Sequence, residues 1–142
     1  MNQPAIEIRP CRIEDISEVL ALWVRAGAVP SPTDDSAALA QRLERDPELF
    51  VIATADSQVV GSLMGGWDGW RGNMYRMAID PQYRRLGLAG RLVETVETGL
   101  RRLGCSRITS LVFKNEEGAV PFWLSTGYFK DDAIDRYAKD LV

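Results

Sequence analysis

Residues 84–90, with the sequence Arg-Arg-Leu-Gly-Leu-Ala-Gly, have the composition and the position of a loop that binds an anion. They follow an apolar run at residues 74–79 that predicts a buried strand, and they precede a run that predicts an amphipathic helix. The first amides of a helix have no partner within it, and its dipole adds about half a positive charge at that end. Arg84 and Arg85 add further positive charge, and Gly87 lets the backbone approach a ligand closely. The pattern therefore predicts a site in which main-chain amides bind a phosphate group.

Two common phosphate-binding motifs do not fit this loop. A Walker loop would end in Gly-Lys-Ser or Gly-Lys-Thr, and the chain contains neither sequence. A dinucleotide-binding loop would have three glycines in the spacing Gly-x-Gly-x-x-Gly and an acidic residue about twenty positions later. Here no third glycine is in place, and Glu94 and Glu97 come too early. An enzyme that acts on nucleotide phosphates would also need a set of magnesium-binding carboxylates near Gly87, and the sequence shows none there.

The loop resembles the acyl-coenzyme A loop of the GNAT N-acetyltransferase superfamily, which is written Arg/Gln-x-x-Gly-x-Gly/Ala. Arg84, Gly87 and Ala89 stand at the motif positions, and residues 78–83, residues 92–93 and the order of elements are also similar to the family. The resemblance implies that acetyl-coenzyme A (acetyl-CoA) is the cofactor, that a strand backbone pairs with its pantetheine arm, and that the loop holds its diphosphate. The cofactor-binding residues that it implies are Met77, Ala78, Ile79, Arg84, Arg85, Leu86, Gly87, Leu88, Ala89, Gly90 and Asn115.

The order of the expected elements favours a mixed α/β fold in one domain, residues 1–142. Helices are predicted around residues 16–23 and 39–43, from 88 to 103, and from 119 or 121 to 126, with Asp34 or Asp35 capping the second. Strands are predicted at residues 6–9, 49–55, 58–65, 74–79 and 108–113, with a weakly alternating edge strand at 134–141. Residues 66–72 are too rich in glycine for regular structure. The resemblance implies a GNAT-like, mostly antiparallel central sheet flanked by helices, in which strands 74–79 and 108–113 form a splayed parallel pair.

The composition sets limits on the function. The chain of 142 residues is 46% hydrophobic and 26% charged, which is typical of a soluble globular domain. It has no stretch that is long enough to span a membrane and no signal-peptide pattern, so we expect a cytoplasmic protein. The absence of histidine removes the Ser-His-Asp and Cys-His catalytic systems and the usual zinc sites, and we expect no metal. A net charge of −3 without a lysine-rich tract argues against a nucleic-acid partner and favours an amine.

Catalysis in the resembling family requires that the amine lose a proton, that the carbonyl be polarised and that the departing thiolate gain a proton. The family often uses a tyrosine for the last task, and Trp123 stands at that position here. An indole N–H donates a hydrogen bond but does not release its proton near neutral pH. The strand at residues 74–79 holds no carboxylate. Its alternation predicts that Tyr75 and Arg76 point to opposite faces, and only the one that faces the cleft can act.

Asp68 is the candidate for recognition of the amine or for a base that acts through water. It lies beside Trp67, Trp70 and Arg71, and aromatic walls with one carboxylate suit a cationic amine. The alternative is that Asp68 shapes a turn while the tryptophans pack on the core. The catalytic candidates are therefore Asp68, Tyr75 and Trp123.

We expect an N-acyltransferase that moves an acetyl group from acetyl-CoA directly to a primary amine of a protein or a small molecule. The loop favours the cofactor, and the resemblance implies the reaction. The alternative is a module that binds acyl-CoA as a sensor or regulator without turnover, which Trp123 and the strand without a carboxylate favour. The sequence leaves open the acceptor amine, the acyl chain and the oligomeric state, and it is compatible with a homodimer.

Overall fold

The computed structural model describes residues 4–114 and 118–141, and the chain divides into two compact units. The first unit extends to Ser110 and the second begins at Leu111, and each is described by itself. None of the described helices combines the length and the apolar content that crossing a membrane requires. A single domain over residues 1–142 stays a prediction.

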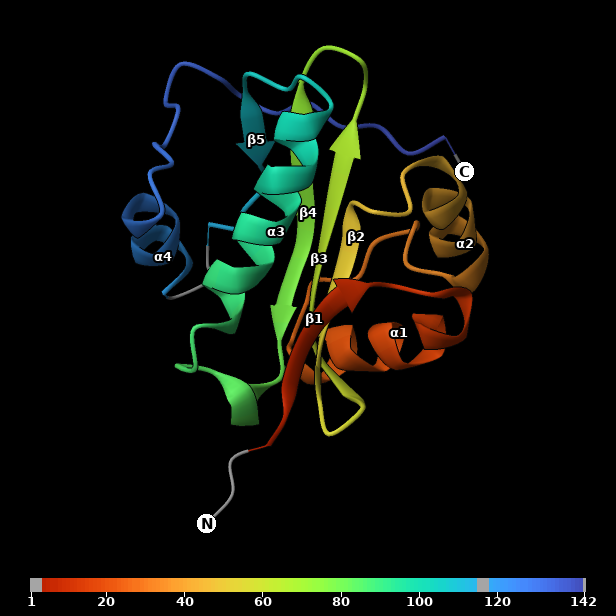
Figure 1. Ribbon diagram of the computed structural model, residues 1–142. Coiled ribbons are helices and arrows are strands. Elements are labelled where there is room, and N and C mark those ends of the chain that lie inside the picture. Colours follow the sequence, from red (N-terminus) through yellow and green to blue (C-terminus); the bar gives the residue numbers. More distant parts are fainter. Residues whose placement is uncertain (1–3, 115–117, 142) are drawn as a thin grey trace. The chain divides into compact units, whose positions relative to one another are not determined.

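A five-stranded sheet forms the centre of the first unit (Figure 1). Its strands are neighbours in sequence order, and they are β1 (Ile6–Pro10), β2 (Phe50–Ala55), β3 (Gln58–Trp67), β4 (Gly72–Ile79) and β5 (Ile108–Ser110). The pairs from β1 to β4 are antiparallel, whereas β4 and β5 are parallel. The predicted mixed fold, with a mostly antiparallel sheet and one parallel pair, is confirmed.

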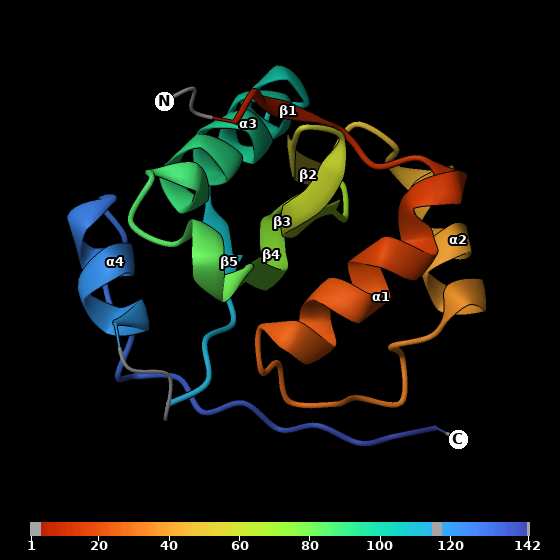
Figure 2. The same ribbon diagram turned by 90° about the horizontal axis from the view of Figure 1, so that it is seen from below.

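Helices cover both faces of this sheet (Figure 2). One face carries α1 (Ile16–Arg25) and α2 (Ser36–Arg45), and the other carries α3 (Leu88–Arg102). Short 3₁₀ turns precede two of the helices: η1 (Ile13–Asp15) leads into α1, and η2 (Pro81–Tyr83) leads into the loop before α3. Asp35 caps α2 by accepting the amide of Ala38 at 2.8 Å, which leaves Asp34 for another role.

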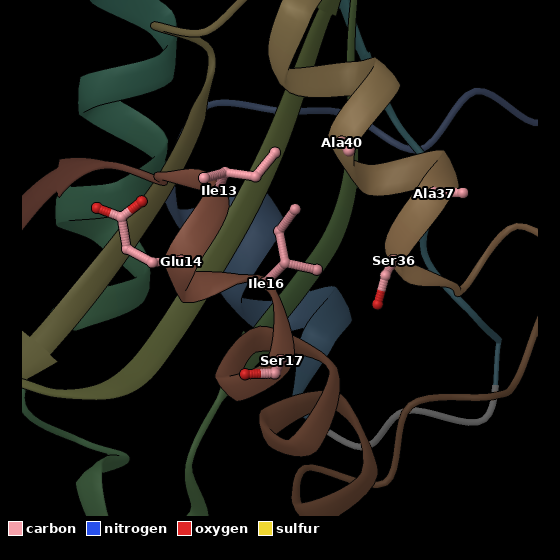
Figure 3. Close-up of a pocket in the computed structure, with 7 residues that line it drawn as sticks. All are labelled: Ile13, Glu14, Ile16, Ser17, Ser36, Ala37 and Ala40. Atoms are coloured by element: carbon pink, nitrogen blue, oxygen red, sulfur yellow. The ribbon is translucent and has the colours of Figure 1, made fainter.

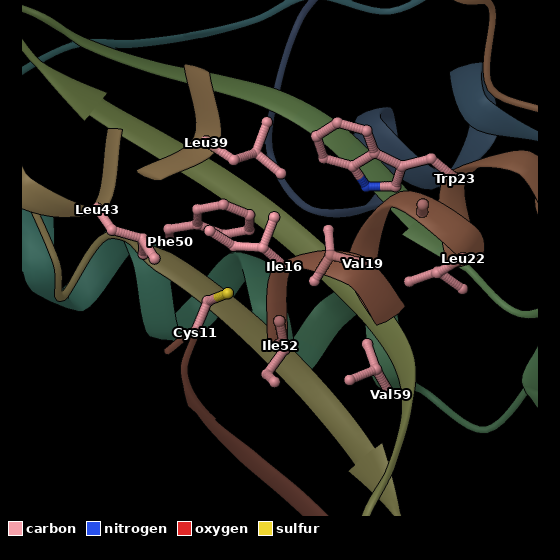
Figure 4. Packing of buried hydrophobic residues seen from close by; sticks show 11 residues of the cluster. Cys11, Ile16, Val19, Leu22, Trp23, Leu39, Leu43, Phe50, Ile52 and Val59 are labelled. Atoms are coloured by element: carbon pink, nitrogen blue, oxygen red, sulfur yellow. The ribbon is translucent and has the colours of Figure 1, made fainter. Parts of the chain in front are cut away.

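The face that carries α1 and α2 holds a large apolar core (Figure 4). The spacing of Ile16, Val19 and Trp23 predicts a buried stripe on α1, and all three side chains are buried. Leu20, the fourth predicted member, is only partly buried, and Leu22 is fully buried in its place. The stripe therefore follows the positions i, i+3, i+6 and i+7, which also lie on one side of a helix.

The opposite face packs against α3. The helix buries the apolar side chains that its spacing predicts, Leu92, Val93, Val96 and Leu100. Gly65 of β3 lies directly beneath it, because a Cβ atom at that position would be 2.6 Å from Val96 Cγ1 and 3.1 Å from the Leu49 carbonyl oxygen. The missing side chain thus lets α3 lie close to the sheet.

The glycine-rich segment at residues 66–72 is strand at both of its ends, which corrects the prediction that all of it is irregular. β3 continues through Trp67 and β4 begins at Gly72, so residues 68–71 alone form the turn. Glycine is compatible with a strand here because a neighbouring side chain uses the space. A Cβ atom at Gly66 would be 3.2 Å from Nη2 of Arg42.

The second unit contains the predicted short helix, which is α4 (Ala119–Ser125). The predicted edge strand at residues 134–141 is wrong, since these residues have no regular structure. Their alternation is weak, and Ile134, Tyr137 and Leu141 all remain exposed, so no face of the segment is buried. The predicted strand at residues 108–113 ends early, at Ser110.

Asp15 is expected to stabilise the N-terminal part of the first unit. Its carboxylate accepts hydrogen bonds from the Arg9 guanidinium at 2.8 and 3.0 Å and from the Arg12 amide at 2.8 Å. The bonds from Arg9 hold the pKa of Asp15 below its usual range. A carboxyl group with a lowered folded pKa adds stability that is present above its unfolded pKa and is lost as the pH falls through the folded pKa. We therefore expect Asp15→Asn to lower the free energy of unfolding at pH 7 by about 3 kcal/mol.

Urea unfolding of both proteins between pH 2 and pH 7 measures this effect. The wild type should lose more stability than the variant below about pH 4, because only the wild type has this carboxyl group to protonate. Glu14→Gln, which changes the neighbouring exposed carboxylate, is the control. If the free energies of unfolding of the wild type and Asp15→Asn differed by the same amount at every pH, the lowered pKa of Asp15 would be contradicted.

Candidate functional site

The loop between η2 and α3 leaves the N-terminus of α3 open. Gly87 precedes the helix with a left-handed backbone, φ +77°, and Arg85 is also left-handed, φ +66°. Arg91 donates its amide to the Gly87 carbonyl at 3.2 Å, so the amides of residues 88–90 have no partner within the helix. Among the described residues, no side chain caps this end of α3. The helix therefore offers these amides to an anion.

Gly87 and Gly90 leave space beside these amides. A Cβ atom on either glycine would have none of the other described atoms within 4 Å. Unlike Gly65, these glycines are not required by packing within the described chain. The space is therefore available to a ligand that lies against the main chain.

Gly90→Ala is expected to separate stability from ligand binding. Alanine is more favourable than glycine inside a helix by about 1 kcal/mol, which should raise the midpoint of thermal unfolding by about 3 °C. If a diphosphate lies against this turn, the added methyl group should also lower the affinity for coenzyme A by about tenfold. Thermal unfolding and calorimetric titration with coenzyme A measure the two effects. Thr95→Ala, which raises helix propensity farther along α3, is the control, and unchanged affinity in Gly90→Ala would argue against this placement.

Arginine side chains connect the loop to the end of α1. Arg84 Nη2 donates to the Ala26 carbonyl at 3.4 Å, and Arg25 Nε donates to Asp80 at 3.0 Å. Asp80 also accepts the amide of Gln82 at 2.9 Å and so holds the start of η2. The segment that leads into the anion-binding loop is therefore joined to the C-terminal end of α1.

β4 loses its partner on the β5 side after a short ladder. Residues 72–74 pair with Ile108–Ser110, and no further pair joins these two strands in the described chain. Within the part of the chain that the structure describes, residues 75–79 of β4 pair only with β3. Met77, Ala78 and Ile79 lie in this part of the strand, so an extended ligand finds a free main-chain edge there.

A bulge in β4 changes the direction of its side chains. On β3, residues 62 and 64 pair with residues 78 and 75, so residue 63 lies opposite both Arg76 and Met77. Arg76 has a left-handed backbone, φ +56°. Its guanidinium group lies over the ring of Trp23 in α1. A Cβ atom on Gly66 would lie 3.2 Å from Arg42 Nη2 of α2 and 3.6 Å from the Tyr75 ring, so the Tyr75 ring points to the face that carries α2. Tyr75 and Arg76 therefore share one face, and the prediction of opposite faces is wrong because the extra residue breaks the alternation.

The guanidinium group of Arg76 is held by several partners. Its Nε and Nη2 atoms donate to the two carboxylate oxygens of Asp34 at 3.1 and 2.5 Å, and Nη1 donates to the Val29 carbonyl at 2.8 Å. The Cζ atom at the centre of this group lies 5.3 Å from the centre of the Trp23 ring. Trp23 Nε1 donates to Ser62 Oγ at 2.9 Å, and the Ser62 hydroxyl donates to the Arg76 carbonyl at 3.3 Å.

We call Trp23, Asp34, Ser62 and Arg76 the bulge cluster. Sequence reasoning missed it as a group. The available signal was a single charged residue in an otherwise apolar run, at residues 74–79. Tyr75 lies beside the cluster on the same face, with 36% of its surface exposed.

Asp68 closes the hairpin between β3 and β4. Its Oδ1 atom accepts the amides of Trp70 and Arg71 at 2.8 and 2.7 Å, and the Arg71 amide, followed by the Trp70 amide, holds the pKa of Asp68 below its usual range. The Arg71 guanidinium group lies 4.1 Å from the centre of the exposed Trp70 ring. This geometry favours the turn-shaping role of Asp68 that the sequence left open.

Trp123 belongs to the second unit, where it packs among aromatic side chains of α4 and the turn that follows. Its ring lies edge-on to Phe122 and Tyr128, with centroid distances of 5.2 and 4.9 Å. Asn115, the other candidate in this part of the chain, lies outside the described residues.

An open pocket of about 500 Å³ lies between the start of α1 and α2 (Figure 3). Ile13 and Ile16 form one wall, and small side chains of α2, including Ala37 and Ala40, form the other. None of its lining residues comes from β4 or from residues 84–90. Over the described residues there is also no group of three or more His, Cys, Asp or Glu side chains arranged to hold a metal ion.

We compared the chain with known proteins by sequence and by fold, and both comparisons find acetyltransferases. The acetyltransferase (GNAT) family model matches residues 16–128. An acetyltransferase of Sodalis glossinidius (strain morsitans) is 33% identical over 137 residues, which cover 96% of each chain. Ard1 from Thermoplasma volcanium superimposes with a TM-score of 0.79 at 21% identity, over 88% of this chain and 83% of that chain.

A second solved structure has a similar fold. The PaiA N-acetyltransferase from Thermoplasma acidophilum, in complex with coenzyme A, gives a TM-score of 0.78 at 19% identity, over 92% of this chain and 93% of that chain. The family model spans most of the sequence, and the relative from Sodalis covers nearly all of it. The chain therefore belongs to the acetyltransferase (GNAT) family.

Proposed function

We propose that this enzyme transfers an acetyl group from acetyl-CoA directly to a primary amine of a protein or a small molecule. One observation carries the proposal: the free edge of β4 leads, through η2, to the open amides at the N-terminus of α3. A donor with a peptide-like arm and a charged diphosphate suits both features. Coenzyme A is bound in the similar protein from Thermoplasma acidophilum, which supports the same choice here.

The residues at these two features suit the two parts of coenzyme A. The main chain of Met77, Ala78 and Ile79 would pair with the pantetheine arm, and residues 85–90 would hold the diphosphate. Arg84 now makes a long hydrogen bond of 3.4 Å to a neutral carbonyl. A hydrogen bond from Arg84 to a phosphate oxygen is stronger, because both groups are charged. Arg84 would therefore leave the Ala26 carbonyl and bind the diphosphate when the cofactor is present.

The chemistry requires little from the protein beyond positioning and proton transfer. The donor supplies a thioester carbonyl that is already activated. The amine nitrogen forms a bond to the carbonyl carbon as the carbon–sulfur bond breaks, the amine loses a proton, and the thiolate gains one. Tyr75 is our candidate for proton transfer, because it is partly exposed and lies just beyond the last β4–β5 pair.

A module that binds acyl-CoA without turnover is the second candidate. It is favoured by the use of the Asp68 carboxylate in a turn and by an indole at the position of the family's tyrosine. Such a module would also need the free edge of β4 and the open amides of α3. Binding of coenzyme A alone therefore does not distinguish the module from the acetyltransferase.

Release of coenzyme A thiol from acetyl-CoA separates the two functions. The assay should use four amines: an alanyl peptide with a free N-terminus, a lysyl peptide with a blocked N-terminus, kanamycin and spermidine. We expect at least one of them to raise thiol release well above the rate without amine, with the acetylated amine detected by mass spectrometry. Tight binding of acetyl-CoA with no amine-dependent thiol in any of the four would favour the module.

A further inference from the structure

We propose that the Arg76–Asp34 ion pair is a latch that fixes the α1–α2 loop, residues 26–35, at the bulge of β4 and thereby sets the affinity for the acceptor amine. The inference rests on the proposed function and adds two positioning residues to it. Neither residue needs to touch the reacting atoms for this role.

The pair holds the loop at several points through one side chain. Arg76 binds both carboxylate oxygens of Asp34 and the carbonyl of Val29, and Asp34 also accepts the amide of Ser31 at 2.9 Å. The loop and the strand are 42 residues apart in sequence at this contact. The side chains of Arg76 and Asp34 are only 15% and 19% exposed. Because all these bonds converge on the Arg76 guanidinium group and the Asp34 carboxylate, loss of either charge should release the middle of the loop.

Two features of Arg76 are unfavourable unless the surrounding structure compensates for them. A non-glycine residue with a left-handed backbone is strained, and a mostly buried ion pair is desolvated. Both occur in one residue, two positions beyond the last β4–β5 pair and next to Met77, whose main chain would pair with the pantetheine arm. Strained residues of this kind are concentrated at functional sites.

The same loop is also joined to the cofactor side of the site. Its first residue, Ala26, accepts the hydrogen bond from Arg84, and Arg25 just before it pairs with Asp80. When Arg84 turns to the diphosphate, the Arg25–Asp80 pair still holds the start of the loop, and the bulge holds its middle and its end. An amine that approaches Tyr75 from the α1 and α2 side meets this loop, because two of its residues already contact Arg76.

The first unit also offers a matched control, the Arg9–Asp15 pair. That pair is bidentate as well, and its side chains are 16% and 10% exposed. It joins β1 to η1 over six residues and has no contact with the α1–α2 loop through its hydrogen bonds. Loss of either pair removes a mostly buried charge interaction, but only the Arg76–Asp34 pair should affect the acceptor.

Steady-state kinetics with the amine that the wild type acetylates best test the latch. We expect Asp34→Asn to raise the KM for that amine by about tenfold while kcat stays within about threefold. The dissociation constant of coenzyme A should change by less than about twofold, since no cofactor contact is lost. The double variant Asp34→Asn/Arg76→Gln should have about the same KM as Asp34→Asn, because residues that act as a unit are not additive. Asp15→Asn should leave the KM unchanged, and an equal rise in both carboxamide variants would overturn the latch.

Hydrogen exchange measured by mass spectrometry gives a second readout that needs no turnover. We expect the peptide that covers residues 27–33 to exchange about tenfold faster in Asp34→Asn, while peptides of β2 and β3 keep their protection. In Asp15→Asn the same peptide should exchange at the wild-type rate. Unchanged exchange of residues 27–33 in Asp34→Asn would overturn the latch even if none of the amines is a substrate. Absence of turnover in the wild type would instead count against the proposed function.

Discussion

Gly87→Asp is expected to lower the affinity for coenzyme A by about a hundredfold. Gly87 lies immediately before the open amides of α3, and a Cβ atom there has space around it, so the new carboxylate would face the bound diphosphate. Two unit charges about 5 Å apart at an effective dielectric constant of about 20 repel by about 3 kcal/mol, which corresponds to that loss of affinity. Calorimetric titration with coenzyme A at low ionic strength measures it.

Gly87→Asn is the matched control, because asparagine has the same shape without the charge. Both residues tolerate a left-handed backbone better than most side chains, so backbone strain at φ +77° is similar in the two variants. We expect the asparagine variant to lose less than about tenfold in affinity. Equal losses in the two variants would mean that backbone strain causes the effect. Unchanged affinity in the aspartate variant would place the diphosphate elsewhere.

Gly65→Ala is expected to lower the free energy of unfolding by about 3 kcal/mol. The added methyl carbon would lie 2.6 Å from Val96 Cγ1 and 3.1 Å from the Leu49 carbonyl oxygen, so α3 or β3 must move. Valine has one stiff side-chain torsion, and a carbonyl oxygen belongs to the backbone, so neither neighbour can yield easily. Urea unfolding at constant pH measures the loss.

A second substitution tests the cause. Val96→Ala removes the nearest neighbour of the new methyl group, so the double variant Gly65→Ala/Val96→Ala should be more stable than the sum of the two single effects allows. Gly90→Ala is the control for replacing a glycine by an alanine, because the added methyl group has space at that position. Wild-type stability in Gly65→Ala would mean that Val96 of α3 does not pack directly against Gly65 of β3.

The parts of the site that depend on neighbouring residues in the sequence were predictable. The helix that starts at Leu88 and its apolar face with Leu92 and Val96 follow from periodicity. The left-handed backbone of Gly87 before the helix was not predicted. The parallel pair of β4 and β5 was implied by the resemblance to the family, and the structure has it.

The bulge cluster was not predictable in the same way. Strict alternation places Tyr75 and Arg76 on opposite faces, and nothing local marks Arg76 as a residue with a left-handed backbone. Its partner Asp34 is 42 residues away, and the sequence left Asp34 and Asp35 as equal candidates for the helix cap. In the structure Asp35 is the cap and Asp34 pairs with the strand. That division of roles depends on the tertiary arrangement.

The turn at residues 68–71 shows a different limit. Composition correctly predicts a break in regular structure here, but it overstates the length of the break because glycines are read as interruptions. Gly66 and Gly72 are instead strand residues beneath neighbouring side chains. The identity of the neighbours, which the sequence does not give, decides whether a glycine breaks a strand or fits within it.

The free edge of β4 also affects how the empty enzyme behaves in solution. A strand edge with unpaired N–H and C=O groups is a template on which another polypeptide can add, and such edges promote aggregation. If pantetheine occupies this position, it blocks foreign strands as well as delivering the acyl group. The substrate would then protect the enzyme that consumes it, and a shortage of coenzyme A would reduce both the rate of acetylation and the colloidal stability of the protein.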